Sequence, residues 1–144
     1  MPVNTATKFN VAPALSVPYS SNDDTARVGA YFDATAYPLD AFFVDVKITA
    51  IYSDGSAAAA YWIAGLFRAD ASGVVTQVGA TASVIAALED TGGMAATLAV
   101  GTPANSGSGA GVTNTEIQVT LTGVAATTIN WVLDNTIRRA PFTS

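Results

Sequence analysis

The chain has 144 residues, of which 50% are hydrophobic and only 12% are charged, and it contains neither histidine nor cysteine. Those two absences exclude disulfides, histidine-based proton transfer, thiolate chemistry and most soft metal sites. Six basic residues, scattered among 11 acidic ones, form no cluster for a nucleic-acid groove, and no apolar run approaches the roughly twenty residues of a membrane-spanning helix.

The first 26 residues predict an extended N-terminal arm. Pro2, Pro13 and Pro18 disfavour a helix here, because proline fixes its own φ and pushes the preceding residue toward extended geometry. Apolar side chains at alternate positions would give this arm one adhesive edge. Our candidates for partner contact are therefore Phe9, Val11, Leu15, Val17 and Tyr19, against the alternative of a disordered terminus.

A series of strands begins at residue 27. The clearest spans residues 41–52, where apolar side chains at even positions alternate with Asp45, Lys47 and Thr49, so that one face packs inward and the other meets water or a partner. We predict further strands at residues 27–34, 61–68, 74–80, 83–88, 94–100, 116–122 and 128–138. Residues 61–68 and 74–80 are typical of a hairpin, and the glycine-rich residues 101–113 predict a flexible loop.

Strands about ten residues apart, with turn signals between them and no helical stripe, predict an all-β fold. We expect an antiparallel β-sandwich, or a jelly-roll-like variant of it, over residues 27–139, with a C-terminal tail at 140–144. Trp131, flanked by Ile129 and Leu133 on one face of its strand, is the strongest candidate for the core.

Carboxylates are the remaining candidates for chemistry. The neighbouring pairs Asp23–Asp24 and Glu89–Asp90 point to opposite faces of an extended chain, so neither pair is a ready acid and base for glycoside hydrolysis. A pairing across loops stays open and would involve Glu89, Asp90 or Glu116. Asp54, Asp70, Glu89 and Asp90 are expected in turns, where capping of local amides is favoured over calcium binding. We therefore predict no enzyme activity, no cofactor, and no catalytic, cofactor-binding or metal-binding residue.

The shortage of charge has its own consequence. Charged residues make up roughly a quarter of a typical soluble chain, about twice the 12% found here. A surface with so little charge covers a free monomer poorly, so we expect part of the outer surface to be buried against partners.

Two segments resemble modules of bacteriophage particles. Residues 61–79 read YWIAGLFRADASGVVTQVG, which resembles a recurring pattern of tail-fibre and virion-decoration modules: an aromatic-led strand, an Arg-x-Asp-x-Ser-Gly turn and a valine-rich return. Residues 117–131, IQVTLTGVAATTINW, resemble the same modules in the same order. The resemblance implies a β-sandwich in a virion protein, commonly trimeric and without catalysis.

A single sandwich behind an arm, with no fibre shaft before it, favours a capsid decoration (cement) protein, which binds and stabilises the outer surface of the phage head. The alternative is a tail-fibre or receptor-binding module that contacts a host surface glycan. The expected partners are the major capsid protein and further copies of this chain in a homotrimer, with no nucleic acid and no membrane, after synthesis in the host cytoplasm. Near the C-terminus Arg138, Arg139 and Phe142 either reach a neighbouring subunit or form a solvated end.

Overall fold

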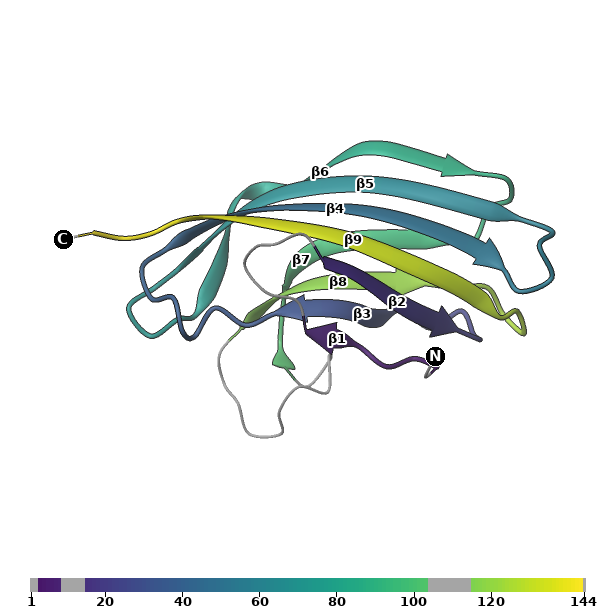
Figure 1. Ribbon diagram of the computed structural model, residues 1–144, viewed down its shortest axis with the longest axis horizontal. Helices are drawn as coiled ribbons and strands as arrows, with labels where there is room; N and C mark the ends of the chain where they lie inside the picture. The colour runs from purple at the N-terminus through teal and green to yellow at the C-terminus, as the bar shows by residue number, and fades with distance from the viewer. Residues whose placement is uncertain (1–2, 9–14, 104–114, 144) are drawn as a thin grey trace.

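The computed structural model describes residues 3–8, 15–103 and 115–143, although the side chains of Leu15, Ala80 and Thr81 lie outside this description. Within these residues the chain forms nine strands (Figure 1). Their bounds are β1 (Thr7–Lys8), β2 (Leu15–Ser21), β3 (Arg27–Phe32), β4 (Ala41–Tyr52), β5 (Ala58–Ala69), β6 (Val75–Glu89), β7 (Ala95–Gly101), β8 (Glu116–Thr122) and β9 (Ile129–Ala140).

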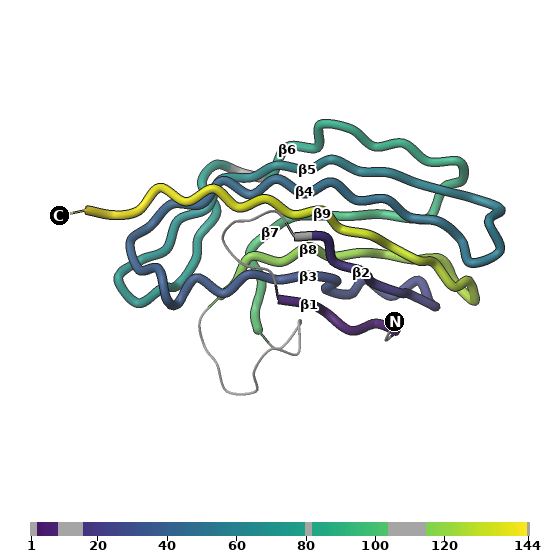
Figure 2. Tube along the Cα trace, viewed as in Figure 1, coloured from purple at the N-terminus to yellow at the C-terminus, as the bar shows by residue number. Residues whose placement is uncertain are grey.

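The strands form two sheets packed against each other, so the expected all-β sandwich is confirmed (Figures 1 and 2). Sheet A has the order β2-β9-β4-β5-β6, and sheet B has the order β1-β3-β8-β7. Neighbouring strands run antiparallel, except for the short parallel pair β1–β3. The predicted hairpin is the β5–β6 pair.

Period-two alternation builds the core. The even-numbered residues of β4 from Phe42 to Ala50 are all buried, and so are the odd-numbered residues of β9 from Ile129 to Ile137. Full burial of one large apolar side chain stabilises the fold by about 1.5–3 kcal/mol. Trp131 has no exposed surface, as predicted, and its Nε1 donates a hydrogen bond to Ser21 Oγ over 2.8 Å.

The prediction of an arm separate from the sandwich is wrong for β2, which is an edge strand of sheet A. Val17 pairs with Leu133 and Tyr19 with Trp131, and both side chains are 1% exposed in the core. Alternating apolar residues suit an adhesive edge and a strand of the chain's own sheet equally well, and here the chain's own sheet buries them. Further upstream, β1 joins sheet B and Val3 bridges to Ser20.

β6 also differs from the prediction, because one continuous strand replaces the two expected at 74–80 and 83–88. Leu66 pairs with Val78 and Ala64 with Ser83, so the residues between Val78 and Ser83 bulge out of the ladder. Gly79 lies at a φ of +87°, in the left-handed region that glycine adopts readily. The glycine bends this strand instead of ending it.

Two polar residues of β8 are buried. Glu116 and Gln118 alternate with apolar residues along the strand, yet they are 2% and 5% exposed. Gln118 Nε2 donates to Glu116 Oε1 over 2.9 Å and to the Thr102 carbonyl over 2.7 Å. These hydrogen bonds compensate for the lost hydration of the two side chains. Of the predicted loop, Gly101 ends β7, and residues 104–113 lie outside the described part of the chain.

Candidate interaction surface

The face of sheet A that points away from sheet B carries the second set of alternating residues, and we call it the outer face. The registers of β9, β4 and β5 place its residues in rows across the three strands. From one end of β4 to the other the rows are Arg138–Phe43–Leu66, Thr136–Asp45–Ala64, Asp134–Lys47–Trp62, Val132–Thr49–Ala60 and Asn130–Ile51–Ala58.

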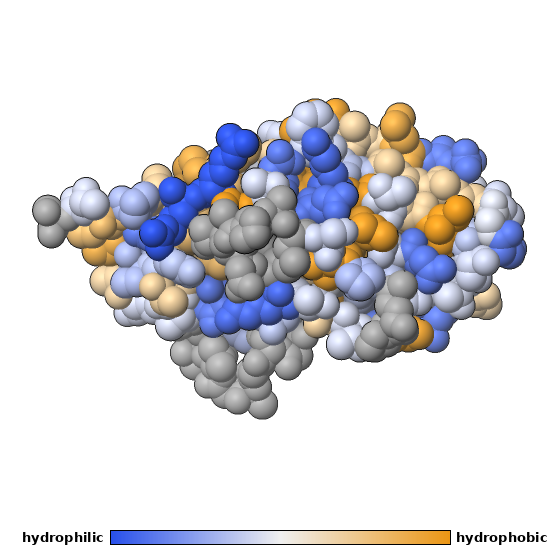
Figure 3. Space-filling model, viewed as in Figure 1, coloured by the Kyte–Doolittle hydropathy of each residue, from blue (hydrophilic) through white to orange (hydrophobic). Residues whose placement is uncertain are grey.

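Exposed apolar side chains form a continuous row at one end of the outer face. Phe43 pairs with Leu66 and Leu66 with Val78, and these three are 45%, 41% and 44% exposed. Single exposed apolar residues are ordinary, but a row across three strands is a contiguous patch. Small side chains beside it allow a flat partner to approach closely. Figure 3 shows hydrophobic groups among paler residues over the half of the molecule that holds sheet A.

The middle of the outer face is polar. Trp62 Nε1 donates to Asp45 Oδ1 over 2.5 Å, and the Lys47 ammonium lies 4.8 Å from the Trp62 ring centroid. Asp134 stands opposite Lys47 in the register. The Lys47 cation therefore covers one face of the indole, and the predicted solvent-facing position of Lys47 is confirmed by its exposure.

The three C-terminal residues predicted to contact a partner, Arg138, Arg139 and Phe142, are not equally free to do so. Arg139 lies 3.5 Å from the Asp40 carboxylate and over the Tyr37 ring, 4.9 Å from its centroid, so its charge is balanced within the chain. Asp40 Oδ1 also accepts the backbone N–H of Phe142 over 2.6 Å and thereby holds the tail. The Phe142 side chain is 56% exposed and Arg138 is exposed beside Phe43. Hydrophilic surface is concentrated next to this tail in Figure 3.

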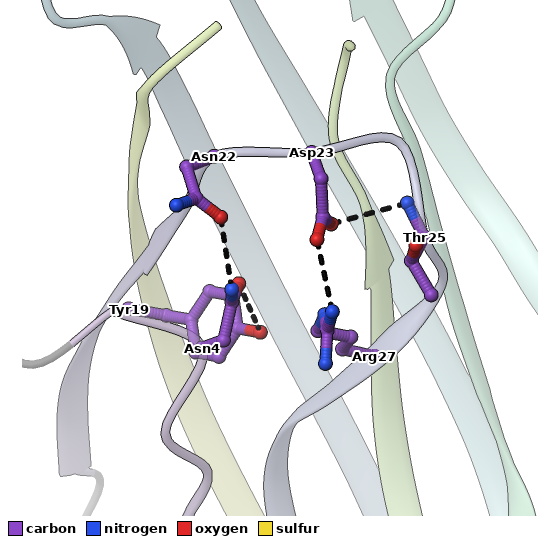
Figure 4. Close-up of polar contacts among 6 residues, drawn as sticks. All are labelled: Asn4, Tyr19, Asn22, Asp23, Thr25 and Arg27. Carbon is purple, nitrogen blue, oxygen red and sulfur yellow. Dashed lines mark hydrogen bonds and ion pairs between the residues drawn. The ribbon is translucent and has the colours of Figure 1, made fainter. Parts of the chain in front are cut away.

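The predicted N-terminal residues do not gather on a free edge. Val17 and Tyr19 are core residues, whereas Phe9, Val11 and the Leu15 side chain lie outside the described part. Polar contacts fix the first residues to the β2–β3 turn (Figure 4). Asn4 Nδ2 donates to Asn22 Oδ1 over 3.0 Å, and the Tyr19 hydroxyl donates to Asn4 Oδ1 over 3.3 Å.

The same turn holds an exposed ion pair. Arg27 donates to Asp23 Oδ2 over 2.9 Å, and this hydrogen bond lowers the pKa of Asp23 (Figure 4). Burial raises the pKa of Tyr19 and outweighs the opposing effect of the Arg27 charge. These contacts are structural ties of the N-terminal segment to the sandwich, and they build no site for a substrate.

The acidic residues in turns mostly bind neighbouring backbone amides. Asp54 accepts from the Ser56 N–H over 2.9 Å, and Asp70 accepts from the Ser72 and Val74 N–H groups over 2.8 and 3.0 Å, so their predicted capping role is confirmed. Asp90 accepts from the Ala58 N–H over 3.0 Å, and Glu89 accepts from the Tyr61 hydroxyl. Among the described residues, no three acidic side chains gather around a common metal position, and no helix is long and apolar enough to cross a membrane.

Sequence reasoning missed a second surface, at the edge where β6 and β7 meet. A cleft of about 360 Å³ opens there between the two sheets, lined by side chains of β5, β6 and β7. One sequence signal could have indicated it: residues 71–88 and 91–115 contain no charged side chain. Solvated strand edges normally carry charges.

No protein-family model matches the chain, and no curated protein matches it. Among solved structures, the tailspike protein of Acinetobacter baumannii phage AM24 is similar over 85% of this chain, with 9% sequence identity and a TM-score of 0.42. The chain spans 26% of the length of that tailspike protein. This similarity carries no inference about function, which rests instead on the surfaces described above.

Proposed function

We propose that this chain is a structural protein of a bacteriophage particle, namely a capsid decoration (cement) protein that binds the outer surface of the head and stabilises it. The observation that carries the proposal is the apolar row Phe43–Leu66–Val78 on the outer face of sheet A. The phage setting comes from the resemblance of residues 61–79 and 117–131, which form the β5–β6 hairpin and the β8–turn–β9 unit.

The outer face suits a large and flat partner. Its small side chains, among them Ala58, Ala60 and Ala64, let two surfaces approach closely, while Arg138 and Lys47 provide the charges that fix orientation. We propose the major capsid protein as this partner. A protein that binds only the assembled head stabilises the head by mass action, so it acts by binding and needs no catalysis.

Copies of the chain associate with one another at a different place in this proposal. Leu39 and Phe142 are 45% and 56% exposed, and they line one shallow hollow beside Arg68. We assign the contact between copies in a homotrimer to this C-terminal cluster. The outer face then stays free for the capsid.

The alternative is a tail-fibre or receptor-binding module that contacts a host glycan. It is favoured by the partly exposed Trp62, which lies beside Asp45, Lys47 and Asp134 on one face, since aromatic rings and hydrogen-bonding groups together bind sugars. It is weakened by Lys47, because its ammonium group occupies one face of the indole where a sugar would stack.

Binding to isolated heads tests the proposal. Purified protein is mixed with phage heads that lack it, the heads are sedimented, and bound protein and the thermal stability of the heads are measured. We expect the wild type to bind and to raise head stability. The double variant Phe43→Asp/Leu66→Asp should lose at least about tenfold in affinity, because it places charges in the apolar row.

The matched control is Val3→Asp, which changes a side chain that is 45% exposed, as Phe43 is, but lies next to Ser20 of β2. Its affinity for heads should stay within about twofold of the wild type. Absence of head binding, or equal losses for both variants, overturns the proposal. Immunogold labelling of whole particles separates the two functions, since label on tail tips supports the alternative. Deletion of residues 1–26 is unsuitable as a test because it removes strand β2, whose Val17 and Tyr19 are core residues.

A further inference from the structure

The two sheets have adjacent free edges at one side of the sandwich. Sheet A ends in β6 and sheet B ends in β7, and β5 and β6 both contact β7. Among the described residues, no strand pairs with the outer side of β7. The cleft of about 360 Å³ opens between these two edges.

The lining of the cleft is mostly apolar. Ile63, Ala82, Val84, Ala96, Leu98 and Ala99 line it, together with the polar Gln77 and Thr97. Val84 pairs with the buried Ile63 and therefore faces the sandwich interior, yet it is 60% exposed. Gln77 pairs with the inward-facing Phe67, and its Nε2 atom is buried without a hydrogen-bond partner among the described residues. An unpaired buried donor is costly, so the position calls for an acceptor.

The backbone at this position is open to pairing. β7 has the sequence AATLAVG, with no charge, no proline and no shift in its register with β8. Natural edge strands are normally blocked by charges, proline, bulges or a covering segment. β6 has two register shifts and is less suited to regular pairing, which leaves β7 as the strand that can accept a neighbour.

We propose that an isolated extended segment of another protein chain adds to sheet B beside β7 and fills the cleft between β6 and β7. Its side chains are uncharged and apolar at alternate positions, to match the cleft, and it offers an acceptor to Gln77 Nε2. The segment is a single strand such as a terminal arm. This inference is independent of the phage assignment.

A peptide of defined pattern tests this proposal. The probe is a fluorescent synthetic peptide of alternating threonine and valine, equal in length to β7 and carrying lysines at both ends for solubility. Main-chain hydrogen bonds supply most of the affinity when a strand is added to a sheet edge, so this generic pattern suffices. We expect saturable binding by the full-length wild type, measured by anisotropy, and slower hydrogen exchange of β7 amides. The same peptide with a central proline should not bind.

Two matched variants locate the site on the protein. Val84→Asp places a charge over the cleft and should weaken binding at least about tenfold. Leu88→Asp changes a residue of the same strand that is 67% exposed, but it pairs with the outer-face residue Ala60 and should change binding less than about twofold. Absence of peptide binding by the wild type, equal effects of the two variants, or unchanged exchange in β7 overturns the proposal. None of these results depends on whether phage heads bind the protein.

Discussion

At the residue scale, Trp131 shows how one side chain serves both packing and hydrogen bonding. It is completely buried, and its indole N–H is donated to Ser21. Replacement of Trp131 by alanine should lower the free energy of unfolding by about 3–5 kcal/mol. Ser21→Ala should cost about 1–3 kcal/mol, because it leaves a buried N–H unpaired. Urea unfolding measures both.

Val132→Ala is the control for these two variants, since Val132 is the next residue of β9 and is 41% exposed on the outer face. Its effect should be about 0.5 kcal/mol or less. A cost for Trp131→Ala as small as that of Val132→Ala would show that the tryptophan is not a core residue in solution.

Tyr61 gives the protein a dependence on alkaline pH. Burial, and secondly its hydrogen bond to Glu89, raise the pKa of the Tyr61 hydroxyl above the ordinary value of 10.0. Above that pH the unfolded chain binds fewer protons than the folded protein, so the free energy of unfolding falls as pH rises. Below about pH 9 the Tyr61 hydroxyl is protonated in both states, so it adds no pH dependence to the free energy of unfolding.

Tyr61→Phe should therefore lose stability less steeply than the wild type between about pH 9 and pH 11. Denaturant unfolding at several pH values measures the two slopes, and tyrosinate absorbance reports the ionisation directly. If the free energy of unfolding falls equally steeply with pH in the wild type and in Tyr61→Phe, the Tyr61 hydroxyl has the same pKa in the folded and unfolded states, which contradicts the prediction. The comparison near neutral pH, where the hydroxyl is protonated in both states, serves as the baseline.

At the scale of the elements, the β5–β6 turn depends on one glycine. Gly73 has a φ of +81°, and a Cβ atom there would lie 2.5 Å from the backbone Cα of Thr35. Gly73→Ala should destabilise the fold by about 2–4 kcal/mol, because backbone strain and a backbone clash act together. Thermal unfolding tests this against Gly92→Ala, where no atom lies within 4 Å. Similar melting temperatures for the two variants would contradict it.

β2 offers a second comparison within one strand. Val17 is buried in the core, whereas the preceding residue, Ser16, is exposed on the other face. Val17→Asp should cost more than about 3 kcal/mol, because it buries an unpaired charge, and Ser16→Asp should be nearly neutral. Circular dichroism measures the melting temperatures of both variants. If neither substitution lowers the melting temperature, β2 is not part of the core, and the segment is a free arm as the sequence predicts.

The elements that the sequence predicts well are those with an unbroken period of two. β4 and β8 lie at the predicted residues, because apolar and polar side chains alternate along both. The sequence pattern places β2 in a separate arm, because its alternating apolar residues suit an adhesive edge as well as a strand of the sandwich. Its Pro18 is tolerated in an edge strand, where a missing N–H need not break the ladder. Near Gly79 the sequence predicts two separate strands, but the left-handed conformation of this glycine bends β6 without ending it.

The interaction surfaces are likewise predictable only where a local sequence pattern determines them. The alternation in β4 predicts that one of its faces is solvated, but the row Phe43–Leu66–Val78 depends on how three strands align, and register is a tertiary property. The cleft at β7 depends on how the edges of the two sheets face each other, which no local pattern encodes. The burial of Glu116 arises from its contact with Gln118, whose polar side chain favoured exposure in the sequence.

At the scale of the whole molecule, the scarcity of charge is distributed unevenly. No lysine or arginine occurs between Arg68 and Arg138, a span that includes all of β6, β7 and β8. The edge at β6 and β7 therefore carries no basic side chain, while the whole chain has a net charge of −5. We propose two separate contact regions on this surface, the outer face and the C-terminal cluster.

The separation of these regions yields the last prediction, which concerns assembly. Leu39→Asp/Phe142→Asp should convert the proposed homotrimer to a monomer in sedimentation velocity experiments, because it places charges at the proposed contact between copies. The fold should survive, since both side chains are exposed and Leu39 has a φ of +66°, a conformation that aspartate adopts more readily than leucine. Phe43→Asp/Leu66→Asp should remain trimeric while it loses head binding. If the outer-face variant dissociates and the C-terminal variant does not, the outer face joins the copies, and the capsid contact must lie elsewhere.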